Sequence, residues 1–234
     1  MKAIFMREMK SYFTSMMGWV VIFVFYVLAG FSFVFLTLIT QSSDLTDTFS
    51  FLLICALVTT PILTMRLISE EKRQKTDQLL LTAPIRLSAI VLGKYFAALV
   101  VYVCCIFSTI IFAVTMGVMA PVEWATLLLT LLGILLAGMA LVSIGIFMSS
   151  ITESQIIALI GTFGVMIFIL LIMLVQGLFQ NEIIRTAISA ISFFDRYSSF
   201  TTGILNISDI LFFISVAAVF NFLTVRVLEK KRWS

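Results

Sequence analysis

The sequence has 234 residues, of which 62% are hydrophobic and only 12% are charged. A soluble domain carries roughly 25% charged residues, and a chain this short could not bury so much apolar surface away from water. The composition therefore predicts an integral membrane protein, and the net charge of +3 is too small to indicate nucleic acid as a partner.

Residues 2–16 are expected to form an amphipathic helix. Apolar side chains recur there at helical spacing, and polar side chains fall on another face. The apolar stripe is Phe5, Met9, Tyr12 and Met16, and the polar face is Arg7, Lys10, Ser11 and Thr14. Such a helix lies in the membrane interface, with its cations toward lipid headgroups or a partner. A simple juxtamembrane anchor is the alternative.

Six uncharged stretches are long enough to be membrane spans, since about 20 apolar residues cross the hydrocarbon core. They are residues 17–40, 48–65, 95–120, 124–150, 154–179 and 210–225. The first is too long for the core of a signal peptide and has no small-x-small cleavage site, so we expect it to be retained. The fold class predicted is all-α, with six transmembrane helices.

The basic residues predict the orientation of these spans. Three precede the first span, six lie between the second and third, and four follow the sixth, which makes thirteen of the fifteen. Only Arg185 and Arg196 lie on the opposite side. Because basic residues concentrate on the cytoplasmic side, both termini are expected to be cytoplasmic.

Residues 69–84 are expected to form a short polar helix at the cytoplasmic surface. Ser69 is a good N-cap, and Glu70 and Glu71 would occupy the first turn, where the helix dipole favours acids. Pro84 disfavours the helical conformation in the residue before it and would end the helix.

Two ion pairs are expected within this helix. Glu71 would reach Lys75, and Arg73 would reach Asp77, each pair contributing about 0.2–0.5 kcal/mol. Leu79 begins an apolar edge beside the charges. A stiff helix of this kind indicates a docking element for a soluble cytoplasmic protein, and a solvated surface helix is the alternative.

Residues 180–209 lie outside, between the last two spans. Their helical apolar stripe is about a dozen residues long, too short to span, which is typical of an interfacial or re-entrant segment. Phe193, Phe194, Tyr197 and Phe200 suit the boundary layer. Ser208 and Asp209 are expected to cap the sixth span.

The absence of certain residue types argues against several classes of membrane protein. No acidic or basic side chain lies in the six stretches and the chain has no histidine, which argues against a proton-driven carrier, a voltage sensor or a haem protein. The three cysteines lie in apolar runs and indicate no metal site. Gly93-Lys94 lacks the rest of a phosphate-binding loop, so energy for transport must come through a partner.

The stretch "ISEEKRQKTDQLLLTAPIRLSAIVLGKY" is similar to the first cytoplasmic loop of ABC-2 type permeases. That pattern has Glu-Glu-basic, a Thr-acid pair, a leucine run, Thr-x-Pro and Gly-Lys. The matching residues are Glu70, Glu71, Lys72, Thr76, Asp77, Leu79, Leu80, Leu81, Thr82, Pro84, Gly93 and Lys94. A glycine often precedes the threonine in this family, and Lys75 stands there instead.

Two further stretches carry the resemblance. "GIFMSSITESQIIALIG" is similar to the turn between spans four and five of the family, and "FFDRYSSFTTGILNISDILFF" resembles its gliding-motility-type (GldF-like) branch. The resemblance implies one ABC-2 transmembrane domain over residues 1–234, with a type V exporter-like fold. Residues 1–16 would be the connecting helix, 66–94 the coupling-helix loop and 180–209 the extracellular re-entrant segment.

The resemblance further implies a permease subunit of an ATP-binding cassette exporter in a bacterial cytoplasmic membrane. A second permease chain, identical or related, would pair with it, and ATP and Mg would bind to a separate nucleotide-binding subunit. No catalytic residue, cofactor or metal is expected in this chain. The residues implied to contact the ATPase are Glu70, Glu71, Lys72, Arg73, Lys75, Thr76, Asp77 and Leu79, with a second contact at Ser150 and Glu153. A membrane scaffold for another cytoplasmic partner and an ion-independent facilitator are the alternatives.

Overall fold

The computed structural model describes residues 1–40, 46–76, 86–119, 124–176 and 182–233. Within these ranges the regular structure is helical, with no strand. Six helical stretches are long and apolar enough to cross a membrane: Met16–Leu38, Thr46–Arg73, Leu87–Gly117, Trp124–Ile151, Gln155–Val175 and Ile207–Lys231. The predicted all-α class with six spans is therefore confirmed.

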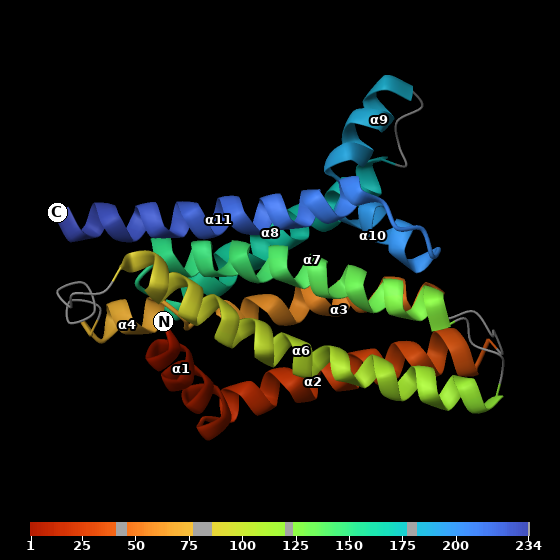
Figure 1. The fold of residues 1–234 in the computed structure, drawn as a ribbon, viewed down its shortest axis with the longest axis horizontal. Helices are drawn as coiled ribbons and strands as arrows, with labels where there is room; N and C mark the ends of the chain where they lie inside the picture. Colours follow the sequence, from red (N-terminus) through yellow and green to blue (C-terminus); the bar gives the residue numbers. More distant parts are fainter. Residues whose placement is uncertain (41–45, 77–85, 120–123, 177–181, 234) are drawn as a thin grey trace.

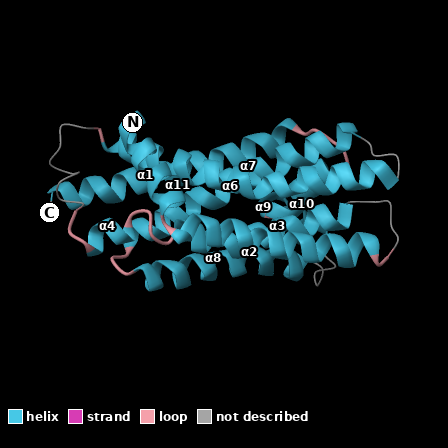
Figure 2. Cartoon of the chain, turned by 90° about the horizontal axis from the view of Figure 1, so that it is seen from below, coloured by secondary structure: helices cyan, strands magenta, loops and turns pink. Residues whose placement is uncertain are grey.

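The long helices run side by side as one elongated bundle (Figure 1; Figure 2 shows it from below). They are α2 (Met16–Phe33) with its π-helical continuation η1 (Val34–Leu38), α3 (Thr46–Thr64), α6 (Leu87–Met119), α7 (Trp124–Ile151), α8 (Gln155–Gln176) and α11 (Ile207–Trp233). The short helices α1 (Lys2–Thr14) and α4 (Ser69–Arg73) lie at the end of the bundle where α11 finishes. The short helices α9 (Glu182–Ile191) and α10 (Phe193–Thr201) lie at the opposite end.

A sharp corner separates α1 from α2. Ser15 takes an extended conformation between the two helices, with φ −84° and ψ 152°. A Cβ on Gly18 would lie 2.6 Å from the carbonyl oxygen of Tyr12, so only glycine lets the start of α2 approach the end of α1 this closely. The corner turns α1 away from the bundle axis and toward the first part of α6, where Ile4 lies against Gly93.

Helix α7 lies at the centre of the bundle. Two thirds of its spanning window is buried, against 17% for α11 and 22% for α8. A Cβ on Gly138 would lie 1.9 Å from the ring of Tyr102, and one on Gly145 would lie 2.2 Å from the hydroxyl of Thr64. Because these two positions of α7 are glycines, α6 and α3 can pack directly against the α7 backbone.

Helix α6 begins earlier than the sequence predicts. The third span was expected to start at Tyr95, but the helix starts at Leu87, and Lys94 lies inside it. The apolar stretch from Tyr95 to Ala120 still contains no ionisable residue, and the helix extends beyond the start of that stretch. The charge seemed to mark the end of the apolar stretch because an isolated ammonium is costly in lipid, whereas the structure surrounds it with acceptors.

Residues 182–209 also differ from their prediction. The aromatic side chains of α10 are buried in the bundle rather than placed in the boundary layer, and the Tyr197 hydroxyl donates to the Phe49 carbonyl at 2.9 Å. Ser208 does not precede α11 but lies in its first turn, and it accepts a hydrogen bond from Arg196. The same guanidinium contacts Asp209 at 2.8 Å, and Asp209 lies in the first turn of α11, where the helix dipole favours an acid as expected.

Candidate functional site

Helix α4 is held at its start by α7. Ser69 was expected to be the N-cap, but it lies in the first turn, and its hydroxyl donates to the carbonyl of Met65. The backbone N–H groups of Ile68 and Ser69 instead donate to the Ser149 hydroxyl on α7, at 3.2 and 3.1 Å. Ser149 itself donates to Met65 at 3.1 Å. A side chain 80 residues away thus provides the cap, which no local pattern could predict.

Helix α4 is only five residues long because the chain turns at Lys75. This residue has φ +56°, in the left-handed region. Its N–H donates to the Lys72 carbonyl and the N–H of Thr76 donates to the Glu71 carbonyl, the two bonds of a Schellman motif. A single helix over 69–84 is therefore wrong, and Pro84 lies outside the described residues.

A group of four charges, in which Lys94 is buried and Arg7 is half exposed, joins α4 to α1 and α6. Lys94 is 1% exposed, and its ammonium contacts Glu8 at 3.1 Å, Glu71 at 3.0 Å and the Leu67 carbonyl at 2.6 Å. Arg7 contacts both carboxylates as well, Glu8 at 2.7 Å and Glu71. We call Arg7, Glu8, Glu71 and Lys94 the α4 clasp.

The clasp replaces the ion pair that the sequence predicts. Glu71 was expected to pair with Lys75, yet its carboxylate points to α1 and α6, and Lys75 is exposed. Two cations and two anions make the clasp electrically neutral. A buried ion pair is stable only when its hydrogen bonds are well satisfied, and all three donors of Lys94 have acceptors here.

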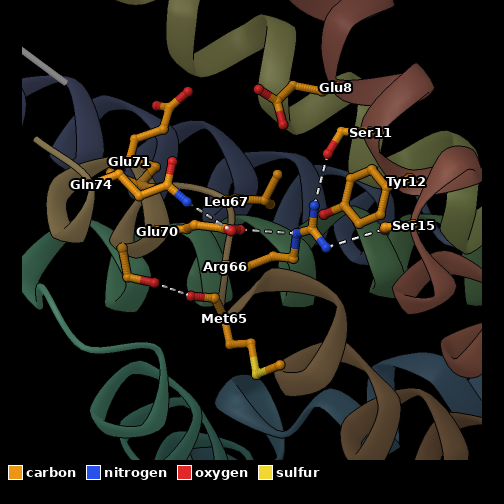
Figure 3. A network of polar contacts seen from close by, with 12 residues as sticks. Glu8, Ser11, Tyr12, Ser15, Met65, Arg66, Leu67, Glu70, Glu71 and Gln74 are labelled. Carbon is orange, nitrogen blue, oxygen red and sulfur yellow. Dashed lines mark hydrogen bonds and ion pairs between the residues drawn. The ribbon is translucent and has the colours of Figure 1, made fainter. Parts of the chain in front are cut away.

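A second network joins α1 to the junction between α3 and α4 (Figure 3). Arg66 contacts Glu70 at 3.3 Å and donates to Ser11 at 2.7 Å and Ser15 at 3.2 Å. Its guanidinium also lies 5.8 Å from the centre of the Tyr12 ring. This part of the polar face of α1 therefore faces the protein's own chain rather than headgroups or a partner.

Helix α4 also contacts the last turn of α7. The Lys72 ammonium donates to the Ser150 carbonyl, and the lysine is 8% exposed. A cation at this position is favourable because the last carbonyls of a helix carry partial negative charge. Glu153 lies just beyond, with its side chain 73% exposed and 3.7 Å from Lys231.

Burial and charge act in opposite directions on the pKa of Glu8. Burial raises the pKa of Glu8, but Lys94 and Arg7 outweigh it, so the pKa lies below its ordinary value of 4.5. Glu8 is therefore ionised at neutral pH. Burial raises the pKa of Tyr12, so its phenol stays protonated and donates to the Leu63 carbonyl at 2.9 Å.

A family model described as ABC-2 family transporter protein matches residues 36–234. The chain belongs to the ABC-2 transporter family. Comparison with curated proteins gave no match. ABC-2 membership makes the chain a multi-pass membrane component of an ATP-binding cassette transporter, and it implies an ATP-binding partner.

The residues expected to dock an ABC-2 partner fall into three groups. Glu70, Glu71, Lys72 and Ser150 contact other parts of the same chain. Arg73, Lys75, Thr76 and Glu153 are exposed. Asp77 and Leu79, with the predicted pair of Arg73 and Asp77, lie outside the described residues. No group of three His, Cys, Asp or Glu side chains is placed to hold a metal in the part of the chain that the structure describes.

Several residues of the site were missed by sequence reasoning. Glu8 is the only acid in residues 2–16, which was a usable signal that its helix has a cationic neighbour. Lys94 stands directly before an apolar stretch, a second signal. The sequence contains no such signal for Ser149, because no local pattern predicts the partner of a serine in an apolar helix.

Proposed function

We propose that this chain is the permease subunit of an ATP-binding cassette exporter and that it docks on a separate ATP-binding subunit through α4 and the turn after it. The observation that carries the proposal is the anchoring of α4. This five-residue helix has polar contacts to three other helices, α1, α6 and α7, and those to α6 and α7 are buried. A surface loop with no mechanical role would not need them.

The contacts suit a force-transmitting element. A partner that moves during ATP binding would displace α4 as a rigid body, since its first turn is tied to Ser149 and its middle to Lys94. The same Lys94 contacts Glu8 on α1. Displacement of α4 would therefore reach the interfacial helix and the α6 span together, and the membrane pathway would respond as a unit.

The wider assembly follows the family expectation. A second permease chain, identical or related, would complete the pathway, and ATP and Mg would bind on the partner subunit. The concentration of basic residues at the α1 and α4 end supports a cytoplasmic location for that end, in a bacterial cytoplasmic membrane. The similarity of residues 193–213 supports the gliding-motility-type branch.

Purification in mild detergent tests the proposal. The full chain should retain an ATP-binding-cassette subunit, and the complex in nanodiscs should hydrolyse ATP, while the chain alone should not because it has no phosphate-binding loop. ATP turnover by the chain alone would contradict the proposal. So would transport by the chain alone in liposomes, which would favour a facilitator, or stable retention of an unrelated protein, which would favour a scaffold.

A further inference from the structure

In the α4 region, the acidic side chains have partners within the chain and the basic side chains at its end are exposed. Glu70 and Glu71 each have a cationic partner within the chain, with side chains 33% and 17% exposed. Arg73 and Lys75 are exposed at the end of the helix. The acids that resembled a docking face in the sequence thus belong to the internal networks, and the cations remain for a partner.

Other exposed cations lie at the same end of the bundle as α4. Arg86, where the chain is next described, is exposed, and residues 77–85 hold a single charged residue, Asp77. Near the end of α11, Lys230 and Lys231 are also exposed. The exposed acid Glu153 already contacts one of these lysines at 3.7 Å.

We infer that the docking surface formed by Arg73 and Lys75 is basic and fits an acidic, carboxylate-lined groove on the ATP-binding subunit. This inference rests on the proposed function. The docking set implied by the sequence contained both charges, and the structure pairs its acids Glu70 and Glu71 with cations of the same chain.

A protein groove fits this surface better than a lipid surface does. Residues 69–76 read "SEEKRQKT" and contain no apolar side chain that could enter a bilayer. Interfacial binding draws on buried apolar area as well as on charge, and α1 supplies that combination, with Met6 and Met16 exposed beside Lys2 and Lys10. Within the described residues 69–76, exposed cations without an apolar residue in the same stretch favour a partner that offers carboxylates.

Charge reversal tests the inference. In nanodiscs, Arg73→Glu with Lys75→Glu should weaken binding of the co-purifying ATP-binding subunit at least tenfold and remove most of its salt dependence, since complementary charges guide and orient docking. Lys2→Glu with Lys10→Glu is the matched control. It changes the net charge equally at exposed positions of α1, and the Kd should stay within about twofold of the wild type.

The outcomes separate the inference from the function on which it rests. Equal Kd values for both double variants would overturn the basic surface and leave the proposed function standing. A loss that occurs only in nanodiscs containing anionic lipid would show that the cations bind headgroups and would also overturn it. Failure of the wild-type chain to bind any ATP-binding subunit would overturn both. Arg73→Gln with Lys75→Gln, which introduces no repulsion, should give an intermediate Kd.

Discussion

At the scale of single residues, Lys94 joins three elements through one ammonium group. It contacts Glu71 of α4, Glu8 of α1 and the Leu67 carbonyl in the turn after α3. Removing one member of a buried ion pair leaves its partner charged and without compensation, which costs far more than the net value of the intact pair. The clasp should therefore be sensitive to single changes and tolerant of balanced ones.

Replacing Lys94 tests that asymmetry. Lys94→Met should reduce the free energy of unfolding by about 3–5 kcal/mol, because Glu8 and Glu71 are left with Arg7 alone. Adding Glu8→Gln restores neutrality and should recover a large part of the loss. Denaturant titration of the four proteins of this double-mutant cycle in detergent measures the coupling. Strictly additive losses would contradict the clasp.

The pH dependence of stability tests Glu8 separately. Its pKa is lowered in the folded protein, so its contribution to stability is fully present above the ordinary value of 4.5 and is lost as pH falls through the folded pKa. Glu8→Gln removes this proton uptake. Between about pH 5 and about pH 3 the Tm of the wild type should fall more steeply than that of the variant. Parallel curves would show that Glu8 gains no stabilisation from Lys94 and Arg7.

At the scale of elements, the end of α4 explains a departure from the family pattern. The family often has glycine before the threonine, and in this chain Lys75 stands there with φ +56°. A side chain in that conformation costs about 1–2 kcal/mol, which glycine avoids. A glycine at this position would suit the Schellman motif that ends this helix.

Lys75→Gly should accordingly stabilise the α4 turn, by about 0.5–1 kcal/mol after the entropy cost of glycine. Hydrogen exchange at the Thr76 amide, which donates to the Glu71 carbonyl, should become slower. Lys75→Val, a β-branched residue in the left-handed region, should make the same exchange faster. Faster exchange in the glycine variant would contradict the turn geometry.

Helices α7 and α8 permit a matched comparison of two glycines. Gly138→Ala should lower the stability of the folded protein by about 1–3 kcal/mol, because its Cβ would overlap the Tyr102 ring. Gly164→Ala on α8 meets nothing within 4 Å and should be neutral or slightly stabilising. Thermal unfolding in detergent measures both. A neutral result at Gly138 would show that α6 and α7 are packed less closely.

At the scale of the whole molecule, the sequence predicts the spans well and the site poorly, for one physical reason. Whether a segment enters lipid or stays in water depends on the side chains within that segment, so six apolar stretches are enough to predict six spanning helices. The contacts of α4 depend on residues far away in the chain: Glu71 and Arg7 are separated by 64 positions, and Lys94 and Glu8 by 86. The sequence therefore predicts Ser69 as a local cap and Lys75 as the partner of Glu71, whereas in the structure Ser149 provides the cap and Arg7 and Lys94 pair with Glu71.

Site-specific crosslinking measures most directly whether the α4 end of the bundle contacts the ATP-binding subunit. A photoreactive phenylalanine analogue at Gln74, an exposed position after α4, should crosslink to that subunit in the intact complex. The same analogue at Thr202, exposed at the opposite end of the bundle, should not. Crosslinks from Thr202, or none from Gln74 in a complex that still hydrolyses ATP, would contradict this account of the docking element.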